Sequence, residues 1–193
     1  MPDAPTARTA RFDILLTGSL EPGVRSSCTL VRDAELVAVV DPGLAPSQAS
    51  LLDPLRALGL EPADVTAVVL SHHHPDHTLN AALFPNAAVH DHWAVYHGDD
   101  WDSRECEGAE LSPSVHLLRT PGHSTEDLST VIGTPEAMVV ATHLWWTAEG
   151  PADDPYAPDR EVLRASRLRV LAFADLVIPG HGAPFRPDAA TPR

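Results

Sequence analysis

Short apolar segments recur along the chain, and turns rich in Pro, Gly and Asp separate them. This pattern is typical of a protein built from many short strands. Residues 12–16 alternate between apolar and more polar positions, while residues 65–70 form an apolar run that indicates a buried strand. We expect strands at residues 12–16, 28–31, 36–40, 65–70, 87–89, 115–118, 128–132, 138–141 and 176–178.

Three segments have the spacing of amphipathic helices. The first runs from Ser47 towards Leu60, or begins at Pro54, because proline is tolerated in a first helical turn. The others lie around residues 79–83 and at residues 160–173, and a loop rich in Pro and Asp fills residues 147–159. Strands and helices mixed in this order predict an α/β protein with helices on both sides of its sheets. We expect one domain over residues 1–193, with residues 1–10 and 187–193 loose.

The charge balance argues against a polyanionic partner. The chain has 13 basic residues, all of them Arg, and 27 acidic residues, so its net charge of -14 repels nucleic acid. We interpret the one local cluster of basic residues as the solvated face of a helix. This cluster consists of Arg160, Arg164, Arg167 and Arg169.

The remaining composition favours a protein of the cytoplasm that has no membrane contact. No apolar run approaches the roughly 18 residues that a membrane span needs, and the N-terminus lacks the pattern of a signal peptide. Cys28 and Cys106 have no CxxC spacing, so a disulfide scaffold is not expected. The sequence makes no prediction of an oligomeric state.

Histidine changes this picture, because the sequence Ser-His-His-His-Pro-Asp-His directly follows the apolar run at residues 65–70. In an extended segment His72, His74 and Asp76 project to one side, and His77 reaches towards a second position. Imidazole and carboxylate groups suit Zn²⁺, Fe or Mn²⁺. A chance run of surface histidines is the alternative, but functional groups gather where a rigid sheet ends in loops. We therefore predict a metal site.

Two further histidines each follow a Pro-Gly pair, namely His123 and His181. Together with the pattern H-x-H-x-D-H at residues 72–77, they give the chain a resemblance to the metallo-β-lactamase superfamily. That resemblance implies an αββα sandwich, in which two mixed β-sheets lie face to face with the helices outside. It also implies that His123 and His181 are ligands at the same edge as the cluster at residues 72–77.

By this resemblance, one metal ion would lie among His72, His74 and His123. A second would lie among Asp76, His77 and His181. One or two Zn²⁺ ions are expected, with Fe or Mn possible, and metal-bound hydroxide would be the nucleophile. Asp76 would orient the hydroxide or relay a proton. Asp41, after the strand at residues 36–40, would orient a ligand histidine.

The chain departs from the superfamily at the position of the Asp that normally bridges both metals, where His143 stands. One imidazole nitrogen cannot bridge two cations as two carboxylate oxygens can. Three outcomes are open: His143 ligates one metal in a looser two-metal site, the site holds a single metal, or His143 turns away and Asp153 or Asp154 replaces it. We favour His143 as a ligand and expect a weakened second metal.

Several residues near these motifs have less specific roles. Trp145, Trp146 and Tyr156 are expected in the core, although aromatic residues beside a metal centre also form substrate walls. We interpret His73 as structural. Ordinary histidines are expected at the four positions without ligand-like spacing, which are His90, His92, His97 and His116.

The resulting prediction is a metal-dependent hydrolase for a small ester, thioester, lactone, amide or phosphoester. Residues 174–186 resemble one subgroup of the superfamily that has been assigned nuclease activity on RNA, but the acidic charge balance does not favour a nuclease. A thiol oxygenase with one iron on His72, His123 and His143 is a second alternative. A non-catalytic metal-binding protein is a third.

Overall fold

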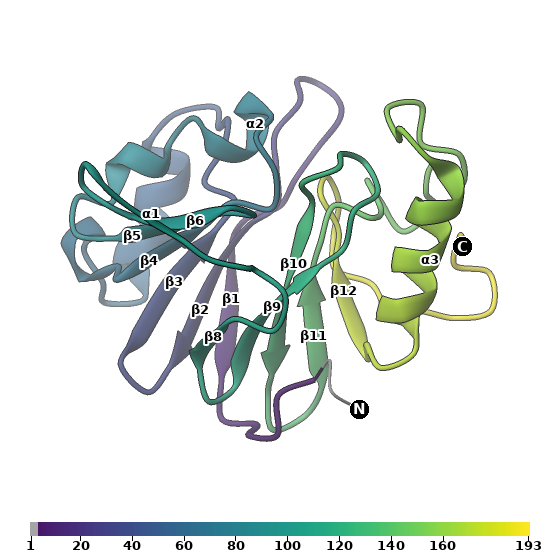
Figure 1. The fold of residues 1–193 in the computed structure, drawn as a ribbon. Coiled ribbons are helices and arrows are strands. Elements are labelled where there is room, and N and C mark those ends of the chain that lie inside the picture. The colour runs from purple at the N-terminus through teal and green to yellow at the C-terminus, as the bar shows by residue number, and fades with distance from the viewer. Residues whose placement is uncertain (1–3) are drawn as a thin grey trace.

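A computed structural model describes residues 4–193, and its strands form two sheets that pack face to face. Figure 1 shows one main helix on the outer side of each sheet, so the layers run helix, sheet, sheet, helix. The prediction of an αββα sandwich is thereby confirmed. Both sheets are mixed, with parallel pairs at β3–β4, β4–β5 and β11–β12 and antiparallel pairs elsewhere.

The seven strands of the first sheet follow one another in chain order, and those of the second are arranged β12-β11-β10-β9-β8. The first sheet consists of β1 (Arg11–Leu16), β2 (Cys28–Asp33), β3 (Leu36–Val40), β4 (Ala67–Val69), β5 (Ala88–His90), β6 (Ala94–His97) and β7 (Asp100–Ser103). The second consists of β8 (Glu110–Ser112), β9 (Val115–Arg119), β10 (Leu128–Gly133), β11 (Met138–Ala141) and β12 (Leu176–Ile178). The helices are α1 (Ala49–Ala57), α2 (Pro75–Thr78) and α3 (Arg160–Leu171), with short 3-10 turns at Pro62–Asp64 and Ala81–Leu83.

Alternation along the central strands divides their side chains between two hydrophobic layers. In β3, Ala38 and Val40 face the core between the sheets, whereas Val39 packs in the layer that contains Leu51 and Leu55 of α1. The same alternation in the second sheet directs part of β9–β12 towards α3. Because both faces of β3, β4 and β11 are covered, the sequences of these strands are apolar throughout, as the run at residues 65–70 indicated.

Two details differ from the sequence predictions. The strands β6, β7 and β8 were not expected, and the helix expected around residues 79–83 is replaced by α2 and a 3-10 turn. Of the two helix starts left open, the earlier one is observed, since Pro54 lies inside α1. Near the start of the described chain, Thr9 is hydrogen-bonded to Asp33 and Ser114. At the other end Trp145 Nε1 donates to the carbonyl oxygen of Pro192.

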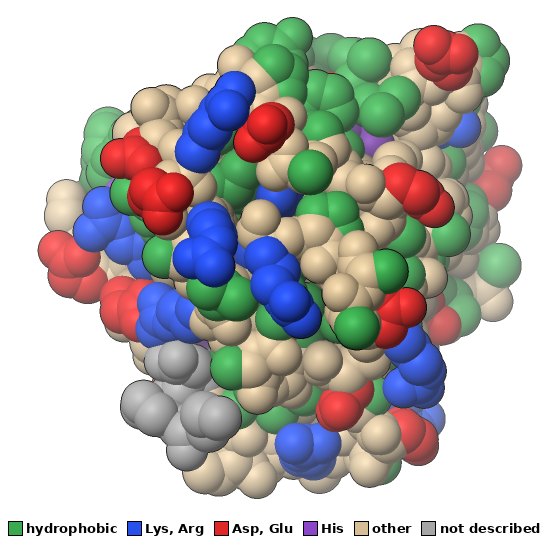
Figure 2. Space-filling view, turned by 90° about the vertical axis from the view of Figure 1, so that its right-hand side faces the viewer, with side chains coloured by type: hydrophobic (Ala, Val, Ile, Leu, Met, Phe, Trp, Pro, Cys, Tyr) green, Lys and Arg blue, Asp and Glu red, His purple; other side chains and the backbone are tan. Residues whose placement is uncertain are grey.

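The basic residues of α3 do not form one solvated face. Arg167 is 0% exposed and donates to the carbonyl oxygens of Leu144, Pro151 and Ala152, so the interpretation of this residue as solvated was wrong. Arg160 pairs with Asp153, and Arg169 pairs with Glu107. Figure 2 shows basic and acidic side chains interspersed over this face of the molecule, with no continuous basic area.

We expect Arg167→Met to lower the free energy of unfolding by about 3 kcal/mol, because three carbonyl oxygens would lose their donor. The guanidinium also lies 5.6 Å from the ring centre of Trp145, and this contact would be lost. Thermal denaturation should show a Tm lower by roughly 6–12 °C. Arg164→Met, an exposed change on the same helix, is the control, and an equal loss in both variants would contradict the assignment.

Candidate metal centre

The candidate metal centre lies at one edge of the sandwich, where the loops after β4, β9, β11 and β12 meet (Figure 1). The loop after β4 supplies the residues of the H-x-H-x-D-H pattern, and each of the other three loops supplies one histidine. The second sheet thus contributes as many histidines as the first. The residues brought together are His72, His74, Asp76 and His77 after β4, His123 after β9, His143 after β11 and His181 after β12.

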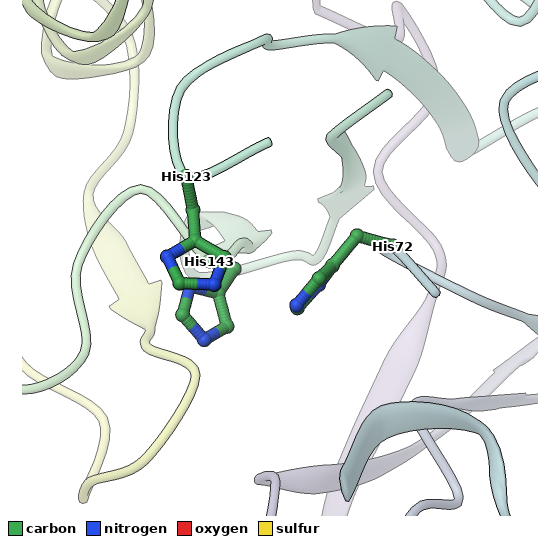
Figure 3. A group of neighbouring side chains, drawn as sticks. All are labelled: His72, His123 and His143. Atoms are coloured by element: carbon green, nitrogen blue, oxygen red, sulfur yellow. The ribbon is translucent and has the colours of Figure 1, made fainter. Parts of the chain in front are cut away.

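One group of possible ligands consists of His72, His123 and His143, each of which places one ring nitrogen within 4.8 Å of those of the other two. Figure 3 shows the ring of His72 approaching those of His123 and His143 from the opposite side. The Nδ1 atom of His74 lies 3.1 Å from Nε2 of both His72 and His123. Two nitrogen ligands of a tetrahedral zinc lie about 3.3 Å apart, so these short separations suit a shared cation.

A second group consists of His77, His143 and His181. The Nε2 atoms of His143 and His181 are 3.0 Å apart, and Oδ2 of Asp76 lies 3.5 Å from His77 Nε2 and 3.6 Å from His181 Nε2. His143 therefore belongs to both groups. The side chain of His143 is only 2% exposed and lies between the two candidate sites, so it does not turn away from the centre.

The pKa values and the hydrogen bonding of several histidines in the centre suit the binding of a cation. Burial and the neighbouring histidines hold the pKa values of His72 and His143 well below the usual histidine range. Burial also lowers the pKa values of His74 and His181. These rings are therefore neutral, which is the form that binds a metal. His77 Nε2 and His143 Nδ1 are buried without a hydrogen-bond partner among residues 4–193, and such atoms are costly unless something binds them.

Asp41 contacts the ring nitrogen of His77 that faces away from the centre and so orients the ring, as the resemblance implied. Its Oδ2 lies 2.8 Å from His77 Nδ1, while Oδ1 accepts a hydrogen bond from the backbone N–H of Ser71. This fixes the ring so that its other nitrogen, Nε2, faces the centre. Asp41 has a positive φ of 52°, a backbone conformation that non-glycine residues adopt at some cost in free energy. The local geometry is therefore held by the surrounding contacts.

Asp154 orients the ring of His123 in the same way that Asp41 orients the ring of His77. Its Oδ2 lies 2.8 Å from His123 Nδ1 and accepts a hydrogen bond of the same length from Trp146 Nε1. Burial raises the pKa of this carboxyl, but hydrogen bonds from His123 and Tyr156 outweigh that effect and lower it. Of the three outcomes left open by the sequence, replacement of His143 by Asp154 is not favoured, because Asp154 contacts the outer nitrogen of His123. Asp153 is exposed and pairs with Arg160.

The segment that carries the pattern is not one extended strand, which was the condition under which His72, His74 and Asp76 would project to one side. The backbone is extended at His74, but helix α2 begins at Pro75, so Asp76 and His77 lie in a helical turn. Proline fixes its own φ near the helical value and is favoured at the first helical position, which accounts for the early start of the helix. Gly43 packs directly against the backbone of Asp76 and His77.

The other histidines lie outside the two groups. His73 turns towards Asp91, 3.1 Å away, and its ring stacks on Trp93. The hydrogen bond to Asp91 outweighs burial and raises the pKa of His73. Burial lowers the pKa of His90 to about 4. No possible metal group found among residues 4–193 includes the histidines that were expected to be ordinary, His90, His92, His97 and His116.

A pocket of about 310 Å³ opens onto the centre. Trp146 and Tyr156 line it, whereas Trp145 is fully buried in the core. Sequence reasoning missed two lining residues in the loop after β1, Leu20 and Val24, for which the loop's Gly and Pro content was the only signal. The lining consists of Leu20, Val24, His74, Asp76, His123, His143, Trp146, Tyr156 and His181.

The sequence pattern described as Lactamase_B, metallo-beta-lactamase superfamily, matches residues 22–183. The chain belongs to this superfamily. The match includes all seven residues of the candidate metal centre. Among the described residues, none of the helices has the length and apolar character to cross a membrane.

Relatives and solved structures of the metallo-beta-lactamase superfamily agree with this assignment. The chain is 35% identical to metallo-beta-lactamase domain-containing protein 1 of Xenopus laevis, covering 83% of this chain and 72% of the frog protein. It covers 59–62% of the mammalian proteins of the same name. A metallo-beta-lactamase structure from Thermotoga maritima has a TM-score of 0.75 at 23% identity, covering 93% of this chain and 100% of that one. The AiiA protein of B. thuringiensis, with N-decanoyl-L-homoserine at its active site, has a TM-score of 0.66 at 23% identity, covering 91% and 94%.

Proposed function

We propose that this chain is a metal-dependent hydrolase that acts on a small ester, thioester, lactone, amide or phosphoester. The observation that carries the proposal is the convergence of six histidines and Asp76 beneath one open pocket. Two of these histidines have a buried ring nitrogen without a hydrogen-bond partner, His77 Nε2 and His143 Nδ1, and a cation would satisfy such an atom. Membership of the superfamily supports the same reading of the site.

We propose that His72, His123 and His143 hold one divalent cation, with His74 close by, and that His77, His143 and His181 surround a second position beside Asp76. Bound cations lower the pKa of a coordinated water and polarise the oxygen of the scissile bond. Zinc is the expected metal, since it binds neutral imidazole in sets of three or more. A neutral His143 has one free ring nitrogen, so it would ligate only one of the two cations at a time, and it adds no negative charge where a bridging carboxylate would.

Asp76 is the residue proposed to move a proton. It lines the pocket, and its Oδ2 faces the ring nitrogens of His77 and His181. We propose that Oδ2 accepts a proton from the attacking water and passes it to the leaving group. For an ester, the bond between the acyl carbon and the alcohol oxygen breaks, the water oxygen remains in the acid, and the proton leaves with the alcohol.

The pocket favours a small substrate over a nucleic acid. Its volume of about 310 Å³ lies at the lower end of the range for small-molecule sites. Two arginines of α3 are paired with acidic residues and Arg167 is buried, so this face offers little to a phosphate backbone. The ligand of the B. thuringiensis structure shows that this fold can hold a small acyl homoserine at its active site.

A three-histidine iron site is the second candidate, and one observation favours it. His72, His123 and His143 form a compact group of buried nitrogen ligands without a carboxylate, and burial lowers the pKa values of His72 and His143. A thiol oxygenase built on this group would contain iron and consume oxygen when given a thiol. Zinc content together with hydrolysis under anaerobic conditions would favour the hydrolase.

Metal analysis and a substrate panel test the proposed function. We expect the purified protein to contain zinc and to hydrolyse at least one p-nitrophenyl ester, thioester, lactone or bis(p-nitrophenyl) phosphate. Prolonged dialysis against a chelator should remove the activity, and added Zn²⁺ should restore it, because the folded chain already brings the ligands together. Bound metal without turnover on any member of the panel would indicate a non-catalytic metal-binding protein.

A further inference from the structure

The pocket has an apolar rim above a polar floor. Leu20 and Val24 come from the loop after β1, and Trp146 and Tyr156 come from the segment after β11. The described residues that line the pocket include no Arg, and their one carboxylate is Asp76 on the floor. A substrate group that reaches the rim therefore meets hydrocarbon and aromatic surface and no basic side chain.

Trp146 and Tyr156 form a single aromatic wall. Their rings stack with centroids 5.9 Å apart and an interplanar angle of 26°. The ring of Tyr156 lies 5.4 Å from that of His123 and 6.4 Å from that of His74. The wall therefore begins directly beside the metal centre, yet Tyr156 is 65% exposed and has a free surface for contact.

Asp154 connects the wall to the metal centre. Its Oδ2 accepts from Trp146 Nε1 and contacts His123 Nδ1, while its Oδ1 accepts from the backbone N–H of Tyr156. The carboxylate is fully buried, so these contacts are made without competition from water. The ring of Trp146 and the backbone of Tyr156 are thus held by the same group that orients His123.

We propose that Trp146 and Tyr156 determine substrate specificity, and that the substrate presents to them an uncharged acyl group that is apolar or flat. This inference rests on the proposed hydrolase function and narrows its substrate class. A carboxylate or phosphate at the rim would lose hydration without gaining a cation, whereas an apolar group would gain aromatic contact. Arg25 follows Val24, but its Nε donates to the carbonyl oxygen of Thr17 within its own loop.

Two esters of equal acyl length test the proposal in the metal-loaded protein. They are p-nitrophenyl hexanoate and mono-p-nitrophenyl adipate, which differ in a terminal carboxylate. We expect kcat/KM to be at least about tenfold higher for the hexanoate. Tyr156→Ala should reduce this ratio to about threefold or less through a higher KM for the hexanoate, and Tyr156→Phe should retain it. Trp101→Ala, at a residue of similar exposure outside the pocket, is the matched control and should leave the ratio unchanged.

Equal rates for the two esters would overturn the proposal, as would a ratio that Tyr156→Ala leaves unchanged. Faster hydrolysis of the adipate would overturn it as well and would point to Arg25 as an anion-binding residue. If the protein hydrolyses no ester, the proposed function is rejected. The role of the aromatic wall is then tested separately, by the binding of an uncharged ligand. In ¹⁹F NMR, 4-fluorophenylacetone should broaden with the wild type and Tyr156→Phe but not with Tyr156→Ala. Equal broadening with all three, or none with the wild type, would overturn the proposal.

Discussion

Replacing His143 with Ala is expected to lower kcat/KM by about 10³-fold, the effect of losing several kcal/mol of metal-based stabilisation in the transition state. The reason is that His143 belongs to both groups of possible ligands, so one substitution removes a nitrogen from each. The metal content should fall at the same time. Elemental analysis after gel filtration, together with steady-state kinetics on the best substrate of the panel, measures both effects.

The matched variants separate a ligand role from a packing role. His143→Asp restores the carboxylate that the superfamily normally carries at this position, and we expect it to keep metal and to bind the second ion more tightly than the wild type does. His97→Ala, an exposed histidine outside the centre, should change neither metal content nor rate. Full metal content in His143→Ala would refute the shared-ligand proposal, because a wall residue would affect the rate alone.

Gly43→Ala is expected to lower the free energy of unfolding by about 4 kcal/mol or more, although it adds a single methyl group. A Cβ atom at this position would lie 1.6 Å from the carbonyl oxygen of Asp76 and 2.0 Å from its carbonyl carbon. The turn after β3 and the start of α2 would have to separate. The hydrogen bond from the Leu44 backbone N–H to the Asp76 carbonyl would be lost with them.

Thermal denaturation should show a Tm lower by roughly 8–16 °C for Gly43→Ala, and elemental analysis should show less bound metal. The same substitution at Gly182 is the control, because a Cβ there would meet its nearest neighbours, atoms of Thr147, at an ordinary 3.4 Å. Gly182→Ala should stay within about 1 kcal/mol of the wild type. A Gly43→Ala protein as stable as this control would show that the two segments are not packed as described.

The residues of the candidate metal centre could be named from the sequence because the pattern around His72 follows an apolar strand and because His123 and His181 each follow a Pro-Gly pair. The resemblance to the superfamily implied that they lie at one edge, and the structure brings their side chains together there. The fold class followed from the same resemblance. The central strands were found because both of their faces are buried, which makes their sequences apolar and easy to detect.

The predictions failed where a residue's role depends on partners far away in the chain. Strand β7 is exposed along its whole length, so its sequence Asp-Trp-Asp-Ser shows no apolar alternation. Spacing alone gave Arg167 a place on the solvated face of a helix, because the three carbonyl oxygens that bind it come from residues 15 to 23 positions away. Asp154 was recognised as a carboxylate near the centre, but its contacts with His123 and Trp146 could not be derived from sequence order.

The origin of the candidate ligands in both sheets has a consequence for the life of the protein in the cell. His72 and His77 extend from the first sheet, and His123, His143 and His181 extend from the second. A cation bound by histidines of both sets would link the two sheets. Because it would bind only the native state, it would stabilise that state by an amount that grows with the free metal concentration. When metal is scarce, the two sheets would separate in more of the molecules, and proteases would degrade these molecules. The amount of protein in the cell would therefore fall as the metal concentration falls.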